Sequence, residues 1–376
     1  MPDLPLRYQP DYAVPPGASL AEALEDQGMT QAELARRTNR PAKTISEIVT
    51  GKAMITPETA LQFERVLGIP ASFWSNLERN YREVLARQAE QRQLEADVGW
   101  LKGFPMADLK RLGFVRYDAD RVGQLRDLLV FFGVASVEAW NNNYHESLQA
   151  HFRKSSAHPV VPGALAAWLR VGELWARQIE SAPFDRARFA AALPRLRELM
   201  QRPASEYGHR LREECLRCGV VVVYVPCFKG SRASGAACWL TAHRPLILLS
   251  DQYRWEDQFC FSFFHEAGHV LLHNKHRKFV DIDGEAQDAD AEGEANVFAA
   301  DALIPRPVIG EFEQRETKSI AAITAFAAQV QVHPGIVVGR LQHDRMLGWD
   351  RCNGLRRRLR IVIPETAGRS DSGAAR

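Results

Sequence analysis

The sequence predicts a mostly α-helical protein with a small α+β part toward its C-terminal end. Helical periodicity with frequent turn signals runs from about residue 19 to about residue 218. Three short apolar runs rich in β-branched residues follow at 220–226, 235–241 and 245–251, and they predict strands of a small sheet. The segment FSFFHEAGHVLLHNKH, 261–276, then predicts an apolar helix with an unusual number of histidines.

Length and composition indicate a globular chain of several domains. The chain has 376 residues, which exceeds one ordinary core, and its 46% hydrophobic and 25% charged residues are typical of soluble proteins. The formal net charge of +2 excludes a polycation, so a nucleic-acid site would have to be a local patch. Six cysteines, no signal-peptide pattern and no membrane-length apolar run predict a cytoplasmic protein without a membrane span.

A helix-turn-helix pattern occupies MTQAELARRTNRPAKTISEIVTGK, residues 29–52. Thr30 precedes Glu33 at the spacing of a capping box, which predicts the start of the first helix. Asn39 stands at the turn, where the backbone needs a residue that tolerates positive φ. Pro41 can open the second helix, because proline is favoured at a helix start.

The same pattern separates an inward face from an exposed one. Leu34, Ala35, Ile45 and Ile48 recur at helical spacing and are expected to pack together. Polar and basic residues on the other face suit phosphate clamping and contact with base edges, whereas a bundle with a solvated polar face is the alternative. The residues expected to contact DNA are Gln31, Arg37, Arg40, Lys43, Thr44, Ser46, Glu47 and Lys52.

The wider segment 17–81 resembles the Xre-type helix-turn-helix domain of HigA-like antitoxins. The resemblance continues beyond the turn through ITPETAL and FWSNLE. It implies a five-helix DNA-binding module that is commonly dimeric and represses by occupying operators. The expected partners are therefore double-stranded operator DNA and a second copy of the chain.

The histidine-rich helix contains the pattern H-E-x-x-H. His265 and His269 are four residues apart, so both imidazoles project from one helix face and can share one tetrahedral ion. Glu266 follows the first histidine and can take a proton from water at the open position. Histidines satisfied inside an ordinary core are the alternative. The pattern favours a zinc hydrolase site.

The third ligand has to come from another segment. His273 lies one further turn along the same helix and moves away from a shared ion. The segment EGEANVFAADALIP, 292–305, predicts a helix that offers Glu292 and Glu294. We expect Glu294, because it stands beside the buried Ala295, whereas Glu292 lies two residues away, about 200° around the helix. Glu292 remains the competing carboxylate.

These two helices and the strands before them resemble the ImmA/IrrE metallopeptidases. The matching segments are RWEDQFCFSFFHEAGHVLLH, EGEANVFAADALIP and the β-rich stretch before them, over about 205–310. The resemblance implies that His265, His269 and Glu294 bind one Zn²⁺ ion, with Mn²⁺ as the alternative ion, and that Glu266 is the catalytic base. The family is linked to regulated cleavage of repressors in stress and toxin–antitoxin settings.

Two separate motif blocks thus predict a DNA-binding regulator that carries a zinc-dependent endopeptidase. The expected substrate is a repressor or antitoxin-like protein, held extended by an edge strand from the 235–251 region. The alternative is an antitoxin or transcription factor whose metal-binding domain senses or binds a partner without proteolysis. The expected segments are an extended arm (1–16), the helix-turn-helix domain (17–81), a helical connecting region (82–204), the metallopeptidase domain (205–350) and a basic, partly disordered tail (351–376).

Overall fold

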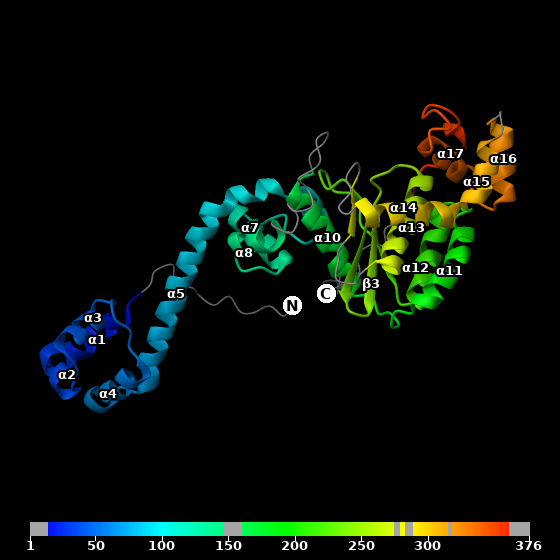
Figure 1. The fold of residues 1–376 in the computed structure, drawn as a ribbon. Coiled ribbons are helices and arrows are strands. Elements are labelled where there is room, and N and C mark those ends of the chain that lie inside the picture. The colour runs from blue at the N-terminus through cyan, green and yellow to red at the C-terminus, as the bar shows by residue number, and fades with distance from the viewer. Residues whose placement is uncertain (1–13, 146–159, 274–278, 283–288, 315–317, 361–376) are drawn as a thin grey trace, which may run out of the picture. The chain divides into compact units, whose positions relative to one another are not determined.

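The computed structural model describes residues 14–145, 160–273, 279–282, 289–314 and 318–360 (Figure 1). The chain forms two compact units, the first ending at Val98 and the second beginning at Gly99. The expected arm and tail lie mostly outside the described residues. Both units are rich in helices and the second holds a small sheet, so the predicted fold class is confirmed.

The described part of the first unit contains five helices, as the sequence predicts. They enclose one core, to which Leu20, Leu34, Ile45, Phe63 and Trp74 contribute fully buried side chains. Burial of this apolar stripe from each helix stabilises a bundle whose helices are mostly too short to persist alone. The helices are α1 (Pro16–Asp26), α2 (Gln31–Arg37), α3 (Ala42–Val49), α4 (Pro57–Leu67) and α5 (Ala71–Asp97).

The turn between α2 and α3 follows the local signals in the sequence. The Thr30 hydroxyl accepts a hydrogen bond of 3.1 Å from the Glu33 backbone N–H and so caps α2. Asn39 adopts φ of 51°, the left-handed conformation expected at the turn. A Cβ on Gly17 would collide with the backbone oxygen of Val49, so the absence of a side chain lets α1 cross α3 closely.

The second unit is built on a four-stranded sheet in the order β1-β3-β2-β4. β1 is parallel to β3, while β2 is antiparallel to both β3 and β4. The three predicted strands are present, and β4 is a fourth that the sequence analysis missed. The bounds are β1 (Val221–Tyr224), β2 (Ala233–Thr241), β3 (Arg244–Leu249) and β4 (Phe279–Ile282).

The strand order corrects the expectation that an edge strand comes from the 235–251 region. β2 and β3 are interior strands, each paired on both sides, and the edges are β1 and β4. β4 takes the edge beside β2 because its backbone pairs with β2 from Ala233 to Ala237. Any extended chain that adds to this side of the sheet therefore meets β4.

Helices cover both faces of the sheet (Figure 1). On β3, Ile247 and Leu249 belong to the core that includes α13, whereas Leu248 lies against Gly172 of α10. This alternation is the period of two expected for a strand buried on both faces. The principal helices are α10 (Pro162–Arg177), α11 (Arg186–Leu199), α12 (Ala204–Arg217), α13 (Glu256–Leu272), α14 (Ala289–Leu303), α15 (Arg306–Glu313), α16 (Ile320–Gln329) and α17 (Pro334–His343).

Much of the predicted connecting region belongs to this second unit. Phe189, Leu196 and Met200 share one buried core with Phe263 and Ala267 of α13. The shorter elements lie earlier in the unit and are centred on clustered aromatic rings. They are η1 (Val98–Gly103), α6 (Met106–Arg111), α7 (Arg121–Phe132), α8 (Val137–Trp140) and η2 (Asn141–His145), and η3 (Asn353–Leu355) lies near the end.

The expected boundary after residue 81 falls inside α5, which continues as far as Asp97. No helix in the described part of the chain is by itself long and apolar enough to span a membrane. The bent pair α16 and α17, with 110° between its two helices, passes that test by length and composition alone.

Candidate metal centre and DNA-binding surface

The metal motif lies on α13, a helix buried on most of its circumference. Phe263, Phe264 and Ala267 pack into the core of the second unit and fix the rotation of the helix. His265 and His269 therefore share another face, where both are 2% exposed. Their Nε2 atoms lie 3.0 Å apart, as the four-residue spacing predicts for two imidazoles that share one ion.

A carboxylate from α14 completes the cluster. Glu292 Oε2 lies 3.1 Å from His265 Nε2 and 3.6 Å from His269 Nε2. One ligand atom from each of the three buried residues lies within 4.8 Å of the other two. Two histidines and one carboxylate are a donor set that suits a catalytic zinc site, which keeps its fourth position open.

The structure corrects the placement expected for the two competing carboxylates. Glu292 is three residues before Ala295 and seven before Ala299, so all three share one buried stripe of α14. Glu294 is about 100° away from Ala295 and its side chain is 66% exposed, compared with 9% for Glu292. Adjacency in the sequence was the wrong criterion, because helix faces repeat every three or four residues.

The protonation pattern of the cluster fits a divalent cation. Burial lowers the pKa of His269, although the nearby Glu292 acts to raise it. Burial alone would raise the pKa of Glu292, but the neighbouring imidazoles of His265 and His269 lower it to about 2. A neutral imidazole and an ionised carboxylate are the forms that bind metal. Glu292 Oε1 is buried without a hydrogen-bond partner among the described residues, as expected for an atom facing a cation.

Asn296, which the sequence analysis did not single out, orients the first histidine. His265 Nδ1 lies 3.0 Å from Asn296 Oδ1, one helical turn beyond Glu292 on α14. The amide oxygen can only accept, so Nδ1 carries the proton and Nε2 presents its lone pair to the cluster. The four-residue spacing from Glu292 is the signal that could have identified this residue.

Glu266 lies in a fully buried position between α13 and the sheet. A Cβ on Gly235 of β2 would lie 2.9 Å from Glu266 Cγ, and nearer still to Oε1. The carboxylate therefore occupies space that any other residue at position 235 would fill. The sequence gives no sign of this contact, because β2 and α13 meet only in the fold.

A pocket of about 420 Å³ opens beside the cluster. It is enclosed by α13, α14, α17 and the loop that follows α17. Asn296 lies in its wall, and the Phe261 ring lies 6.2 Å from the His265 ring and 6.3 Å from the His343 ring. Ile336 and Trp349 add apolar surface, so the pocket suits a large side chain of a bound molecule.

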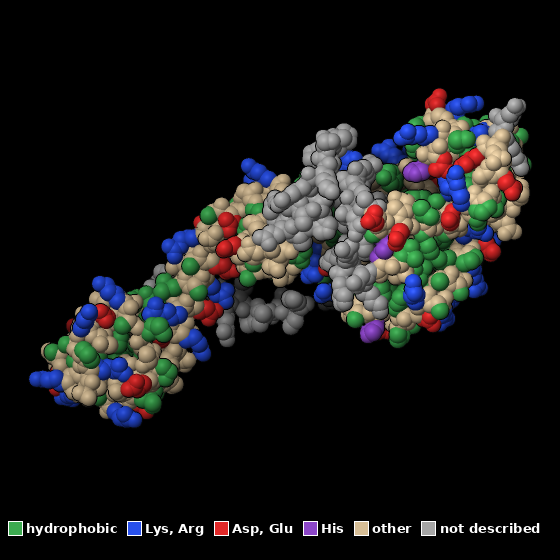
Figure 2. All heavy atoms as spheres, viewed as in Figure 1, with side chains coloured by type: hydrophobic (Ala, Val, Ile, Leu, Met, Phe, Trp, Pro, Cys, Tyr) green, Lys and Arg blue, Asp and Glu red, His purple; other side chains and the backbone are tan. Residues whose placement is uncertain are grey.

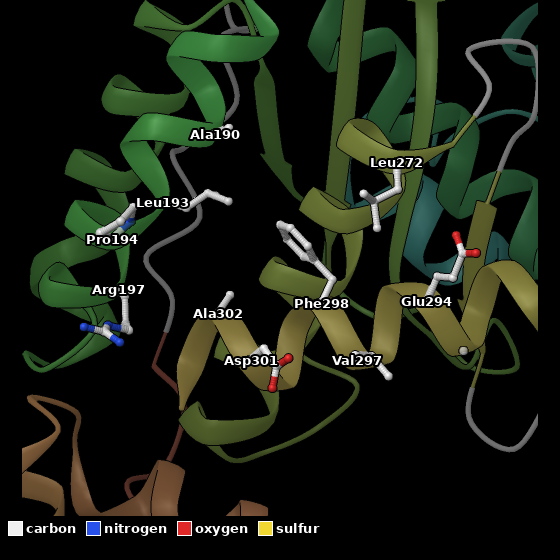
Figure 3. Close-up of a pocket in the computed structure, with 11 residues that line it drawn as sticks. Ala190, Leu193, Pro194, Arg197, Leu272, Glu294, Val297, Phe298, Asp301 and Ala302 are labelled. Carbon is white, nitrogen blue, oxygen red and sulfur yellow. The ribbon is translucent and has the colours of Figure 1, made fainter. Parts of the chain in front are cut away.

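A second, wider groove of about 940 Å³ lies between α11 and α14 (Figure 3). Leu193 of α11 faces Phe298 and Ala302 of α14 across it, and Leu272 and Glu294 lie at one end. Figure 2 shows hydrophobic side chains gathered on this face of the second unit.

The residues expected to contact DNA lie on or beside α2 and α3 in the first unit. Gln31, Arg37, Lys43, Ser46 and Lys52 are exposed, and Lys and Arg side chains are visible over this unit in Figure 2. Thr44 and Glu47 are partly exposed.

Arg40 differs from the rest of that surface. Its side chain is only 20% exposed, because its Nε donates to Gln62 Oε1 at 2.6 Å and its Nη2 lies 3.7 Å from Glu58 of α4. In this structure Arg40 connects the turn to α4, so a DNA contact would require it to leave these partners.

Family models match both units. The model described as helix-turn-helix matches residues 20–74, and the model described as IrrE N-terminal-like domain matches residues 216–342, which contain the whole His–His–Glu cluster. The chain belongs to the Xre-type helix-turn-helix proteins and carries an IrrE/ImmA-like peptidase-family domain. The predicted family resemblances are thereby confirmed, and the chain is a DNA-binding regulator of this class with a metal-dependent type of peptidase domain.

Individual relatives match the first unit. The HTH-type transcriptional regulator YddM of Escherichia coli (strain K12) is 35% identical over 63 residues, which are 17% of this chain and 67% of YddM. The solved Pseudomonas aeruginosa antitoxin HigA with its higBA promoter is 30% identical, over 23% of this chain and 95% of HigA, with a TM-score of 0.22. An addiction-module antidote protein of the HigA family from Coxiella burnetii is 29% identical over 23% and 94% of the two chains, with a TM-score of 0.21.

Proposed function

We propose that this chain is an operator-binding regulator whose second unit is a zinc-dependent endopeptidase that cleaves a protein partner such as a repressor or antitoxin. One observation carries the proposal: His265, His269 and Glu292 converge in a buried cluster, and Glu266 lies on the same helix between the two histidines. A purely structural cluster would have no need of a buried carboxylate at position 266.

The three converging residues would hold the ion through His265 Nε2, His269 Nε2 and the Glu292 carboxylate. Bound Zn²⁺ supplies Lewis acidity, which lowers the pKa of water and polarises a carbonyl group. Mn²⁺ remains the alternative ion, since a carboxylate ligand also suits it. The lowered pKa of the buried His269 and the lowered pKa of Glu292 favour this donor role.

Glu266 would act as the general base and then as the general acid. It accepts a proton from the attacking water and returns that proton to the leaving amine after the peptide bond breaks. Gly235 is part of this arrangement, because its bare backbone leaves room for the Glu266 carboxylate. The fully buried position limits the solvent around that carboxylate.

The sheet and the pocket suit an extended polypeptide substrate. β4 is the edge strand beside β2, so a substrate strand can add to the sheet there through backbone hydrogen bonds. The pocket lined by Phe261, Ile336 and Trp349 then accepts one large side chain of that substrate. Backbone pairing gives affinity and the pocket gives sequence preference.

The first unit would bring the chain to double-stranded operator DNA, most simply as a homodimer. α3 presents Ser46 and the partly exposed Thr44 and Glu47 toward the groove, while Arg37, Lys43 and Lys52 clamp phosphates. Their exposure supports this role, because each can be desolvated by DNA without disrupting the core. Gln31 stands at the first position of α2, where its side chain can reach the backbone of DNA.

The test compares the zinc-loaded parent with the Glu266→Gln variant. Both are expected to bind operator DNA equally, and both keep zinc, since the three ligands are unchanged. Only the parent is expected to cleave the repressor or antitoxin-like protein encoded beside it, measured by mass spectrometry of new N-termini. Equal cleavage by the variant would contradict the role of Glu266 as the general base. Zinc and DNA binding without cleavage by either protein would favour the regulator that binds a partner without proteolysis.

A further inference from the structure

Two residues beyond the candidate ligands extend the metal cluster toward the surface. His273 Nδ1 lies 2.9 Å from His269 Nδ1, and His273 Nε2 lies 3.1 Å from Glu294 Oε2. We propose that Glu294 and His273 are positioning residues that fix the tautomer and ring orientation of His269 for metal binding. This inference rests on the proposed function, because it takes His269 as a metal ligand.

The direction of each hydrogen bond follows from the carboxylate of Glu294, the last group in the series His269, His273, Glu294. The Glu294 carboxylate oxygen is an acceptor, so His273 donates to it from Nε2. The other ring nitrogen of His273, Nδ1, is then placed to accept from His269 Nδ1–H. His269 Nε2 is left with its lone pair, directed at His265 and Glu292.

The end of α13 makes this contact possible. The helix stops at Leu272, and His273 adopts an extended backbone conformation, with φ of −108° and ψ of 170°. Its backbone N–H still donates to the His269 carbonyl oxygen at 3.2 Å, which holds the two residues together. The His273 ring therefore lies against the Nδ1 side of His269, and it cannot reach an ion held on the Nε2 side.

The rotation of α14 about its axis explains why Glu292 and Glu294, so close in sequence, face different parts of α13. Glu292 and Glu294 are two residues apart, about 200° around the helix. Glu292 faces the middle of α13 and Glu294 reaches its C-terminal end, where Figure 3 shows the Glu294 side chain near Leu272. One carboxylate would bind the ion directly, and the other would act through two imidazoles.

The two histidine ligands thus reach the same tautomer by different routes. His265 donates from Nδ1 to the amide oxygen of Asn296, inside the fold. His269 donates from Nδ1 to His273, whose own partner Glu294 is 66% exposed at the end of the α11–α14 groove. Carboxylate partners of this kind orient metal-bound histidines and raise their basicity.

The experiment measures zinc affinity by competition with a chromophoric chelator, in the full-length protein. His273→Phe keeps a ring and removes the acceptor, so affinity is expected to fall about 10–100-fold, the loss typical of outer partners of metal ligands. Glu294→Ala is expected to lose several-fold, since water can replace an exposed carboxylate. Glu294→Gln keeps an acceptor oxygen and should retain most of the affinity.

The matched control is Asp290→Ala, which removes another exposed acid one turn earlier on α14. Its zinc affinity is expected to equal that of the parent, which separates hydrogen bonding from simple loss of charge. The visible spectrum of Co²⁺-loaded His273→Phe and Glu294→Ala should keep the band pattern of the parent, because the three ligands remain.

Parent-like zinc affinity in both His273→Phe and Glu294→Ala would overturn the inference. A changed Co²⁺ spectrum in Glu294→Ala, with zinc lost altogether, would also overturn it, because Glu294 would then be a ligand. Neither result depends on proteolysis, so this inference can fail while cleavage still requires Glu266. A parent protein that binds no zinc would contradict this inference and the proposed function together.

Discussion

The exposed surface of α2 and α3 and the candidate metal centre use charged side chains in opposite ways. On the helix-turn-helix unit, Glu33 pairs with Arg37 and Lys43 lies 3.8 Å from Glu47, each pair within one helix and largely exposed. In the candidate metal centre, the buried Glu292 instead joins α14 to both histidines of α13. The pairs on α2 and α3 join neighbouring residues of one helix and are exposed to solvent. The contacts of Glu292 join two separate helices inside the protein.

This difference suits the helix-turn-helix surface to binding DNA and the candidate metal centre to holding its groups in fixed positions. Exposed pairs four residues apart contribute only about 0.3–0.5 kcal/mol, so DNA phosphates can displace them at little cost. A buried carboxylate is costly to leave without a partner, so the positions of the metal centre are fixed before any ion or substrate arrives. Substitutions on the helix-turn-helix surface should change DNA binding alone. Substitutions in the candidate metal centre should change metal content or turnover.

The largest effect is expected for Glu292→Ala. Removal of this carboxylate leaves two histidine donors, too few for a stable zinc site, so affinity should fall by more than about 100-fold, beyond the loss typical of outer partners. Isothermal titration of the apo-protein with zinc measures it. Glu294→Ala, treated in parallel, should lose much less. Zinc affinity equal to that of the parent in Glu292→Ala would contradict the assignment of Glu292, rather than Glu294, as the third ligand.

The next effect is expected for Gly235→Ala on β2. The new methyl group would displace the Glu266 carboxylate, because the three heavy atoms nearest to it all belong to Glu266. Turnover should fall about 10–100-fold, part of the roughly 10²–10⁴-fold that general acid–base catalysis contributes. Zinc stoichiometry should remain that of the parent, which metal analysis of the purified protein checks.

Gly310→Ala provides the matched control for that substitution. Gly310 lies in α15, and a Cβ there would have no heavy atom within 4 Å. Its turnover should equal that of the parent. If Gly235→Ala cleaves as fast as Gly310→Ala does, the Glu266 carboxylate does not act from the position that this structure gives it.

The smallest effect is expected for Lys43→Ala on α3. Its side chain is 85% exposed, so the free energy of unfolding should change by less than about 0.5 kcal/mol. Operator affinity should fall several-fold, and the slope of log affinity against log salt should decrease by about one, as for one lost phosphate contact. Fluorescence anisotropy at several salt concentrations measures both, with Lys102→Ala in the second unit as control. An unchanged slope would show that Lys43 makes no contact with a DNA phosphate.

Local signals carried most of what the sequence could predict. The Thr30 cap, the positive φ of Asn39 and the buried stripe of α2 and α3 depend on neighbours within a few residues. The shared face of His265 and His269 likewise follows from one helix alone. Each of these predictions needs only helix geometry, and the structure confirms each placement.

Contacts between separate elements were the part that the sequence could not decide. The choice between Glu292 and Glu294 depends on how α14 is rotated against α13, which the packing of Ala295 and Ala299 fixes. β4 was missed because its four residues carry too little periodicity to stand out from a loop. The contact of Gly235 with Glu266 exists only once β2 and α13 are brought together.

The most direct test of the metal centre is an anomalous-difference map of zinc-loaded crystals, recorded on both sides of the zinc absorption edge. A single strong peak is expected between α13 and α14, at about 2.0–2.2 Å from His265 Nε2, His269 Nε2 and a Glu292 oxygen. Glu294 is expected to contact His273 in the structure refined from the same crystals, with no bond to the ion. A peak coordinated by Glu294, or no peak at the two histidines, would contradict this assignment.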